Sequence, residues 1–455
     1  MKTRPWLVTM ECFGLLRIYP GLSSMKSEQE IVITGIGVVS PIGIGKEDFW
    51  TSLVEGRSGV RAFDTYDDPK LPPPFGAKVL DFEPKRYVRP RKSLKVMSRD
   101  IQLGFAAADL ACAESGMHEK HVDPERLGIV FGADLIPGEL SELVEAFSGC
   151  MVDGKFDFSR WGHEAMEDMY PLWMLKYLPN MPACHIGIAQ DARGPNNSLT
   201  LGDVSSLSAV AEAARVILRG QADVMIAGGT GSRTHPALMI SNEVTGAGER
   251  AAVFGMSRRS DDPTTASRPF DAERDGMVSG EGAGAFILET RQHAERRGAK
   301  IIGRVLSFAT AFECHRKGEF PTGTAIRQTI ESSLDRAGLR PNQIGHVNAN
   351  GLGTIHGDRI EAKAIHETVG DVPVTAPKSY FGNLRAGAGA VEMVASLLAF
   401  EKGVVPATLN YETPDPQCPV NVISDGPIET TESTALVLNH AYFGQAAAVV
   451  LAAEE

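Results

Sequence analysis

The chain has 455 residues, enough for two or three ordinary domains or one large duplicated domain. Hydrophobic residues make up 43% and charged residues 22%, a balance that is typical of a globular enzyme and excludes a disordered chain. The net charge of −12 without a basic tract argues against a nucleic-acid-binding surface, and six cysteines without a CxxC pair argue against a disulfide framework. These features are typical of a cytoplasmic protein with reduced thiols.

The first 25 residues differ from the rest of the chain. Two basic residues precede an apolar stretch, as in a secretory signal, but Glu11 and Arg17 interrupt that stretch and no clean cleavage site follows. We therefore expect residues 1–25 to be a disordered extension, or the chain to start at Met25 rather than Met1. Neither this stretch nor any other offers enough consecutive apolar residues for a membrane span.

Short β-branched runs bounded by glycine alternate with helical patterns along the remaining chain. In chain order, the predicted strands cover residues 31–34, 128–131, 224–227, 285–288, 303–308, 372–375, 435–438 and 446–451. The predicted helices include residues 100–115, 204–219, 324–337 and 388–401. This alternation predicts an α/β protein whose sheets are covered by helices. Two stretches rich in proline and charge, 64–74 and 137–182, are typical of surface insertions or contacts between subunits.

The helical patterns form a weak internal repeat. Each half contains an amphipathic helix that ends at a glycine, Gly116 or Gly338, and an alanine-rich helix that is apolar on nearly every side, 204–218 or 388–400. A helix that is apolar all round is normally buried. The repeat therefore predicts a duplicated α/β unit with two central helices.

Several familiar motifs are absent or incomplete. Gly35-Ile36-Gly37 follows a strand like the start of a dinucleotide fingerprint, but the third glycine is missing and Pro41 follows. The chain has no P-loop, no HExxH and no GxSxG. The adjacent cysteine–histidine pairs at 184–185 and 314–315 have diverging side chains, so we expect structural roles for them. We expect neither a metal nor a cofactor.

Three segments of unusual composition stand out together. The first, GPNNSLTLGDVSS (194–206), reads as a tight turn that leads into a buried helix. The second is RPFDAERDGMVSGEGAG (268–284), and the third runs from NANG (348–351) to KSYFGN (378–383). With these segments in this order, the chain resembles the β-ketoacyl-[acyl-carrier-protein] synthases, most closely the type II condensing enzymes, from about residue 30 to the end.

The resemblance implies an α/β thiolase-like fold with two duplicated halves in a five-layered α-β-α-β-α arrangement. It places the halves at 26–290 and 291–455, and it implies a dimer that acts on acyl carrier protein or another acyl thioester in fatty-acid or polyketide assembly. In the family, a cysteine takes the acyl group and two histidines promote decarboxylation of the malonyl unit. A thiolate suits this role because it is a strong nucleophile favoured at a helix N-terminus.

This chain departs from the family at all three of these catalytic positions. The cysteine position holds Asp203, and the histidine positions hold Asn350 and Asn383. The family's lysine is matched by Lys378, and one phenylalanine of its carboxy-terminal turn is matched by Phe443.

Two threonines that touch the pantetheine in the family correspond to Leu352 and Thr354, so only the second is kept.

These replacements disfavour condensation by the chain alone. A carboxylate is a poor acyl carrier, and asparagine does not exchange protons near neutral pH. We therefore expect a non-condensing subunit, similar to a chain-length factor, in a homodimer or in a heterodimer with a cysteine-containing synthase. The usual replacement for the cysteine in chain-length factors is glutamine, not aspartate. The alternatives are an active 3-oxoacyl synthase, or a decarboxylase or acyl transferase that uses Asp203 as base or nucleophile.

The same residues have structural interpretations. We expect Asp203 to cap the following helix, Asn350 and Asn383 to hydrogen-bond Asp203 and each other, and Lys378 to neutralise Asp203.

Two histidines, His356 and His440, are candidates to replace the missing histidines, although surface or satisfied core positions are the favoured explanation for both.

Overall fold

The structure is a computed structural model that describes residues 30–64, 72, 74–117, 122–246, 248–316 and 319–454. The expectation for residues 1–25 and most of the predicted insertion at 64–74 lie outside these residues.

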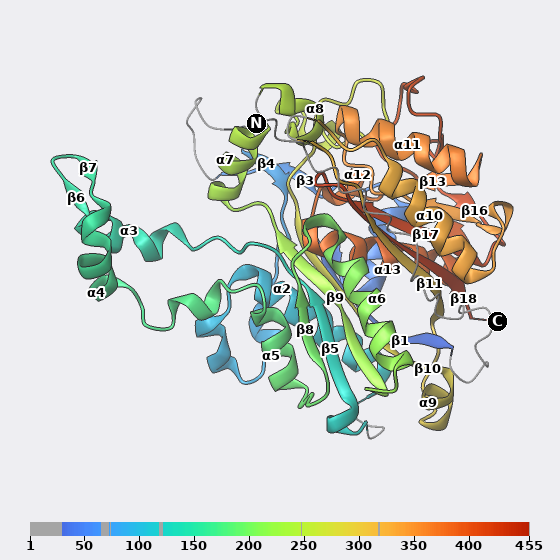
Figure 1. Cartoon of the computed structure of the whole chain (residues 1–455), viewed down its shortest axis with the longest axis horizontal. Coiled ribbons are helices and arrows are strands. Elements are labelled where there is room, and N and C mark those ends of the chain that lie inside the picture. The colour runs from blue at the N-terminus through green and yellow to red at the C-terminus, as the bar shows by residue number, and fades with distance from the viewer. Residues whose placement is uncertain are drawn as a thin grey trace, which may run out of the picture.

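The central element is one hydrogen-bonded path of strands that passes through both halves of the chain (Figure 1). In sheet order, the first half supplies β8 (Asn196–Leu199), β5 (Leu127–Gly132), β9 (Val224–Ser232), β10 (Glu281–Thr290) and β1 (Ile31–Ser40), with β2 (Gly43–Ile44) beside β1. The second half continues with β11 (Gly303–Phe312), β18 (Gln445–Ala453), β17 (Thr434–His440), β12 (His346–Asn348), β13 (Pro373–Thr375) and β15 (Asn421–Val422). The halves meet where the first residues of β1 pair with the start of β11, so β8 and β15 are the two edges.

Helices cover this path in layers. The central layer consists of α6 (Ser205–Leu218) and α13 (Ala388–Lys402), which share one hydrophobic cluster with strands of both halves. The helices α2 (Arg99–Ser115) and α5 (Met181–Ala189) pack on the outer face of the first half, and α10 (Thr324–Ala337) and α11 (Ile355–Val369) pack on that of the second half. The result is the five-layered arrangement expected from the resemblance.

Two glycines of β1 explain why α2 lies so close to the sheet. A Cβ atom at Gly35 or Gly37 would collide with the backbone carbonyls of Ala111 or Ala107 in α2. The glycines that suggested half of a nucleotide fingerprint therefore serve helix–sheet packing, and Pro41 continues into a turn rather than a helix.

The predicted regular elements are confirmed. Each predicted strand overlaps an observed one, and the helices at 99–115, 205–218, 324–337 and 388–402 match the predicted segments. The repeat is confirmed as well, because Gly116 and Gly338 both end their helices in the left-handed conformation, at φ 64° and 68°.

Shorter elements complete the two halves. They are the helices α1 (Lys46–Val54), α7 (Pro236–Thr245), α8 (Ala251–Phe254), α9 (Arg291–Arg296) and α12 (Lys378–Phe381), and the strand pairs β3 (Val60–Ala62) with β4 (Phe75–Ala77) and β14 (Val404–Val405) with β16 (Ile428–Glu429). Within the described residues, none of the helices is both long enough and apolar enough to cross a lipid bilayer.

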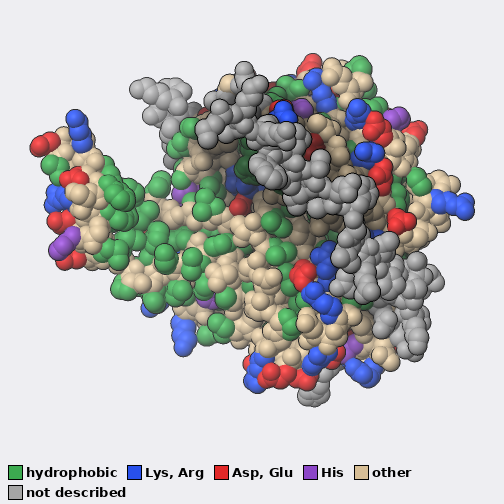
Figure 2. Space-filling model, viewed as in Figure 1, with side chains coloured by type: hydrophobic (Ala, Val, Ile, Leu, Met, Phe, Trp, Pro, Cys, Tyr) green, Lys and Arg blue, Asp and Glu red, His purple; other side chains and the backbone are tan. Residues whose placement is uncertain are grey.

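The predicted insertion at 137–182 forms an arm that projects from the body of the molecule (Figure 1). The arm holds α3 (Leu140–Gly149), the strand pair β6 (Met151–Val152) and β7 (Lys155–Phe156), and α4 (Met166–Asp168). Its own small core consists of Ala146, Cys150 and Ala165. Figure 2 shows hydrophobic side chains along its length, and the exposed ones are Leu140, Val144, Phe147, Met151, Val152, Phe156, Phe158, Met166, Tyr170, Leu172 and Met174.

Candidate functional site

Asp203 lies in the turn that enters the central helix α6. Gly202 adopts a left-handed conformation at φ 61°, and residues 202–204 form one turn of 3-10 helix before α6 begins. This turn packs against the short 3-10 helix Arg385–Gly387, which follows Asn383. Asp203 is buried at the N-terminus of α6, where the helix dipole favours its negative charge.

The prediction that Asp203 caps α6 is wrong. The N-cap residue is Val204, no side chain caps the helix, and Oδ1 of Asp203 is buried without a hydrogen-bond partner. The extra 3-10 turn places Asp203 inside the helical start rather than before it. The hydroxyl of Ser205 accepts from the N–H of Leu201 instead, at 2.9 Å.

Asn350, which follows β12, belongs to a buried polar network with residues of α12, α13 and β17. Its Oδ1 accepts from Nζ of Lys378 at 3.0 Å and from Nδ2 of Asn439 at 3.2 Å. Lys378 forms an ion pair with Glu392 of α13, and Asn439 donates to the other carboxylate oxygen of Glu392 at 2.7 Å. The backbone N–H of Asn350 donates to Glu361 at 2.6 Å.

This network corrects two predictions. Lys378 neutralises Glu392 rather than Asp203, and Asn350 bonds to neither Asp203 nor Asn383 among the described residues. The sequence analysis did not identify Glu392 as a partner. The signal was available, because a glutamate within an otherwise apolar buried helix needs a cation or a hydrogen-bond donor.

Asn383 has a different role from the one predicted. Its Oδ1 accepts the backbone N–H of Arg385 at 2.8 Å, and its Nδ2 approaches the sulfur of Met277 at 3.7 Å. Arg385 itself adopts φ 49°. An asparagine side chain that accepts a hydrogen bond from the backbone N–H two residues later favours a turn. Asn383 therefore stabilises the turn that carries Arg385.

The two positions predicted to contact pantetheine, Leu352 and Thr354, lie at the start of α11. Thr354 occupies the N-cap position and is buried, with no hydrogen-bond partner at its hydroxyl, while Leu352 is half-buried between Gly351 and Gly353. Neither makes a side-chain contact with Asp203 that the structure records.

The motif RPFDAERDG holds this region together. Arg274 is buried and pairs with Asp358 at 3.5 Å and with Asp415 at 2.9 Å. Asp358 accepts the backbone N–H of Phe270 at 2.8 Å, and burial raises the pKa of Asp358 to about 6 despite the attraction from Arg274. The motif therefore acts as a structural clamp between the halves, beside α11.

Phe443 is exposed in the turn after β17. Its ring packs edge-on against Tyr442, with centroids 4.6 Å apart, and Tyr442 contacts Phe254 at 3.7 Å. The turn thus forms an aromatic rim on the surface.

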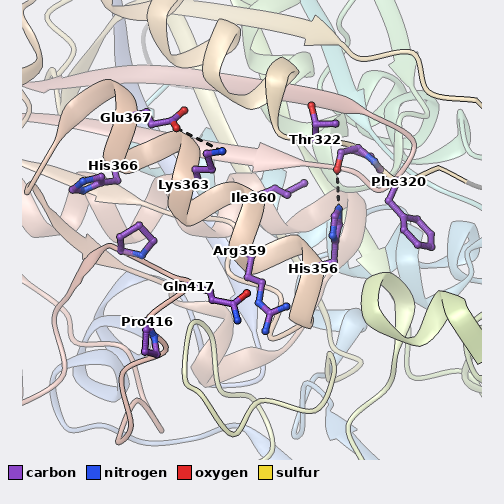
Figure 3. A pocket seen from close by; sticks show the side chains of 12 residues that line it. Phe320, Thr322, His356, Arg359, Ile360, Lys363, His366, Glu367, Pro416 and Gln417 are labelled. Carbon is purple, nitrogen blue, oxygen red and sulfur yellow. Dashed lines mark hydrogen bonds and ion pairs between the residues drawn. The ribbon is translucent and has the colours of Figure 1, made fainter.

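The two candidate histidines, His356 on α11 and His440 on β17, have different partners. His440 is buried, its carbonyl lies 3.5 Å from Nδ2 of Asn350, and its Nε2 lies 3.5 Å from Glu361. The Nε2 atom of His356 bonds to the carbonyl of Pro321 at 2.7 Å, and this histidine lines a surface groove of about 650 Å³ (Figure 3). Only His440 is therefore near the candidate site.

The site offers no thiol at the start of α6. The described free cysteines are Cys112, Cys150, Cys184, Cys314 and Cys418. Burial raises the pKa of Cys112, and burial raises the pKa of Cys418 to about 12, so neither is a thiolate near neutral pH.

Comparison with known proteins identifies the family. Sequence models described as "Beta-ketoacyl synthase, N-terminal domain" and "Beta-ketoacyl synthase, C-terminal domain" match residues 28–294 and 302–412. The chain is 31% identical over 429 residues to the 3-oxoacyl-[acyl-carrier-protein] synthase 2 of Coxiella burnetii, covering 93% of this chain and 98% of that protein. It is 32% identical over 439 residues to the tetracenomycin polyketide synthase ketoacyl synthase alpha subunit of Streptomyces glaucescens, covering 94% and 97%.

Among solved structures, the ishigamide ketosynthase/chain length factor matches with a TM-score of 0.79 at 27% identity, covering 94% of this chain and 99% of that chain. The five-layered α/β arrangement is accordingly the thiolase-like fold. With both domain models and nearly full-length relatives in agreement, the chain belongs to the β-ketoacyl synthase family.

Proposed function

We propose that this protein is a non-condensing subunit of fatty-acid or polyketide assembly that works together with a cysteine-containing synthase. The observation that carries the proposal is Asp203 at the start of α6, the position where the family's acyl-carrying cysteine belongs. Asn350 and Asn383 stand at the two histidine positions, and their amide groups are engaged in structural hydrogen bonds.

The chemistry at this position opposes acyl transfer. An acyl group on Asp203 would form a mixed anhydride, which water hydrolyses readily, and no neighbouring side chain at the two histidine positions exchanges a proton near neutral pH. The same geometry weakens the alternatives of an active synthase or a proton-transferring decarboxylase.

A partner subunit is supported by two features of the surface. The strand β8 lies at an edge of the sheet and pairs only with β5 among the described residues, so one row of its backbone groups is available to another chain. The arm at 137–182 exposes many apolar side chains, and exposed apolar patches of this kind mark contacts between proteins. A dimer through β8 and the arm, as a homodimer or with an active synthase, fits both features, and acyl carrier protein is the proposed source of the acyl thioester.

The division into halves near residue 290 and a cytoplasmic location are part of the same proposal. The division into halves is supported by the connecting segment, which contains α9, between the end of β10 at Thr290 and the start of β11 at Gly303.

Mass spectrometry of a defined mixture tests the catalytic part. The purified chain is incubated with carrier protein bearing a medium-chain acyl group and with malonyl-carrier protein, and β-ketoacyl- and acetyl-carrier protein are quantified against a reaction without the chain. We expect neither product. A β-ketoacyl product would overturn the proposal, and acetyl-carrier protein alone would establish decarboxylation instead.

The partner is tested by sedimentation of the chain alone and of the chain co-expressed with a cysteine-containing synthase. We expect a dimer that the substitution Phe158→Asp on the arm weakens, while Lys363→Asp on the opposite half of the molecule leaves it intact. A wild-type monomer under both conditions would exclude this part of the proposal.

A further inference from the structure

Four charged side chains that the sequence analysis did not connect come together beside α6. They are Asp134 after β5, Asp203, Arg233 after β9, and Arg385; we call them the charge cluster. Asp203 is buried, with 8% exposure, whereas the side chains of Arg233, Asp134 and Arg385 are partly buried, with 12%, 14% and 25% exposure. Asp134 binds both arginines, through an ion pair with Nε of Arg385 and at 3.8 Å from Nη1 of Arg233.

The cluster reaches Asp203 through Arg385. The guanidinium nitrogens of Arg385 lie 3.7 Å from the point where a Cβ on Gly202 would stand, directly beside Asp203. Burial, together with repulsion from Arg385, lowers the pKa of Arg233 to about 10, and the attraction of Asp134 and Asp203 opposes that change. The four groups therefore share one electrostatic environment.

The cluster is held in place by structure on both sides. Asn383 stabilises the backbone of Arg385 through its 2.8 Å hydrogen bond, and the side chain of Arg233 also binds the amide oxygen of Asn242 on α7. Yet the hydrogen bonds are incomplete, because Oδ1 of Asp203 is buried without a hydrogen-bond partner among the described residues. A buried carboxylate oxygen of this kind is stabilised by a polar donor and not by a hydrocarbon.

An alkyl chain placed here would remove the remaining solvent from two guanidinium and two carboxylate groups and return no hydrogen bond to them. Desolvation of a charged group without compensation is among the costliest events in a protein interior. We propose that the charge cluster makes the region beside Asp203 reject a hydrocarbon acyl chain, and that Arg385 is the residue that determines this specificity. If the proposed function holds, this subunit carries no acyl chain of its own, and the growing chain stays in the partner.

Binding of dodecanoyl-pantetheine to the full-length chain tests the proposal by titration calorimetry. We expect no saturable binding to the wild type. The substitution Arg385→Leu replaces the charge by a shorter apolar side chain and is expected to tighten binding at least about tenfold beyond the wild-type detection limit. Arg385→Lys keeps a positive charge and is expected to behave like the wild type. Arg327→Leu on α10, which removes an exposed arginine that pairs with Glu331, is the matched control.

Saturable binding to the wild type that Arg385→Leu leaves unchanged would overturn the proposal, and so would a folded Arg385→Leu variant that gains no binding. A second measurement needs no variant: photolabelling of the wild type with a dodecanoyl-pantetheine that carries a diazirine at the chain end. We expect no label in residues 132–136, 231–235 or 383–387, and label in these segments would overturn the proposal. Acyl binding without condensation would refute this inference alone, whereas a β-ketoacyl product would refute the proposed function.

Discussion

Removal of the buried cation Lys378 provides a demanding test of the polar network. The side chains of Lys378 and Glu392 are 1% and 0% exposed, and their ion pair is supported by Asn350 and Asn439. The substitution Lys378→Met keeps an unbranched apolar chain but leaves the Glu392 carboxylate with a single amide donor. Breaking a buried ion pair from one side costs about 3–5 kcal/mol, and we expect the free energy of unfolding to fall by that amount in urea at pH 7.

The pH dependence of the variant adds a second readout. Burial raises the pKa of Glu392, and the attraction of Lys378 opposes that rise, so the pKa rises further without Lys378. With a raised pKa, the folded state binds the Glu392 proton more tightly than the unfolded state does. The stability is therefore highest where this carboxyl is protonated, and it falls as the pH rises from the ordinary pKa towards the folded-state pKa. We therefore expect the stability deficit of Lys378→Met to grow as the pH rises above the ordinary pKa of a glutamate.

The control and the double variant decide whether the network is the cause. Lys363→Met removes a 68% exposed lysine that lies 3.8 Å from Glu367, and we expect it to change stability by less than about 0.5 kcal/mol. Lys378→Met/Glu392→Leu removes both charges and is expected to recover most of the loss. A Lys378→Met variant within about 1 kcal/mol of the wild type, or a double variant no better than the single one, would refute the reasoning.

Three further predictions concern other parts of the chain. Burial and repulsion from Glu281 raise the pKa of Asp100 to about 7. The wild type therefore loses stability as the pH rises from about 4 to about 8, and we expect Asp100→Asn to gain up to about 4 kcal/mol relative to it over this range. Thermal unfolding at each pH measures this difference, and equal pH profiles for the two proteins would contradict the prediction. Asp203→Cys places a thiol at the N-terminus of α6 and is expected to react with iodoacetamide yet to form no acyl adduct with acyl-carrier protein, as intact mass will show; an adduct would contradict the charge-cluster inference. Gly389→Ala puts a methyl group against Oδ1 of Asn439 and the side chain of Leu207, and it is expected to cost about 1–3 kcal/mol in urea unfolding. Gly162→Ala in the arm meets no described atom within 4 Å and serves as its control.

The sequence by itself determined the architecture. Strand and helix patterns are local, because the spacing of apolar residues reports which face of an element is buried. The apolar faces of 204–218 and 388–400 therefore predicted two central helices, which are α6 and α13. The glycine after each amphipathic helix predicted that the helices end at Gly116 and Gly338 in the left-handed backbone conformation. This prediction is also local, because glycine adopts positive φ angles without a steric penalty.

Local residue type also located the candidate site, but it did not predict the contacts within it. An aspartate before an apolar run is typical of a helix N-cap. Only the structure shows that Asp203 lies within a 3-10 turn, Gly202–Val204, one residue before the N-cap of α6. Sequence order placed Asn350, Asn383 and Lys378 near one another without specifying their partners.

The tertiary structure decided the charge partners. Lys378 pairs with Glu392 on a different helix, and Arg385 pairs with Asp134 from the other half of the chain. Pairing of this kind depends on how two distant elements pack and on which charged groups become buried there. The local spacing of residues in the sequence does not specify either of these. The sequence thus determined that a charge stands at the head of α6, and the packing of the two halves determined that this charge has arginines rather than a lysine beside it.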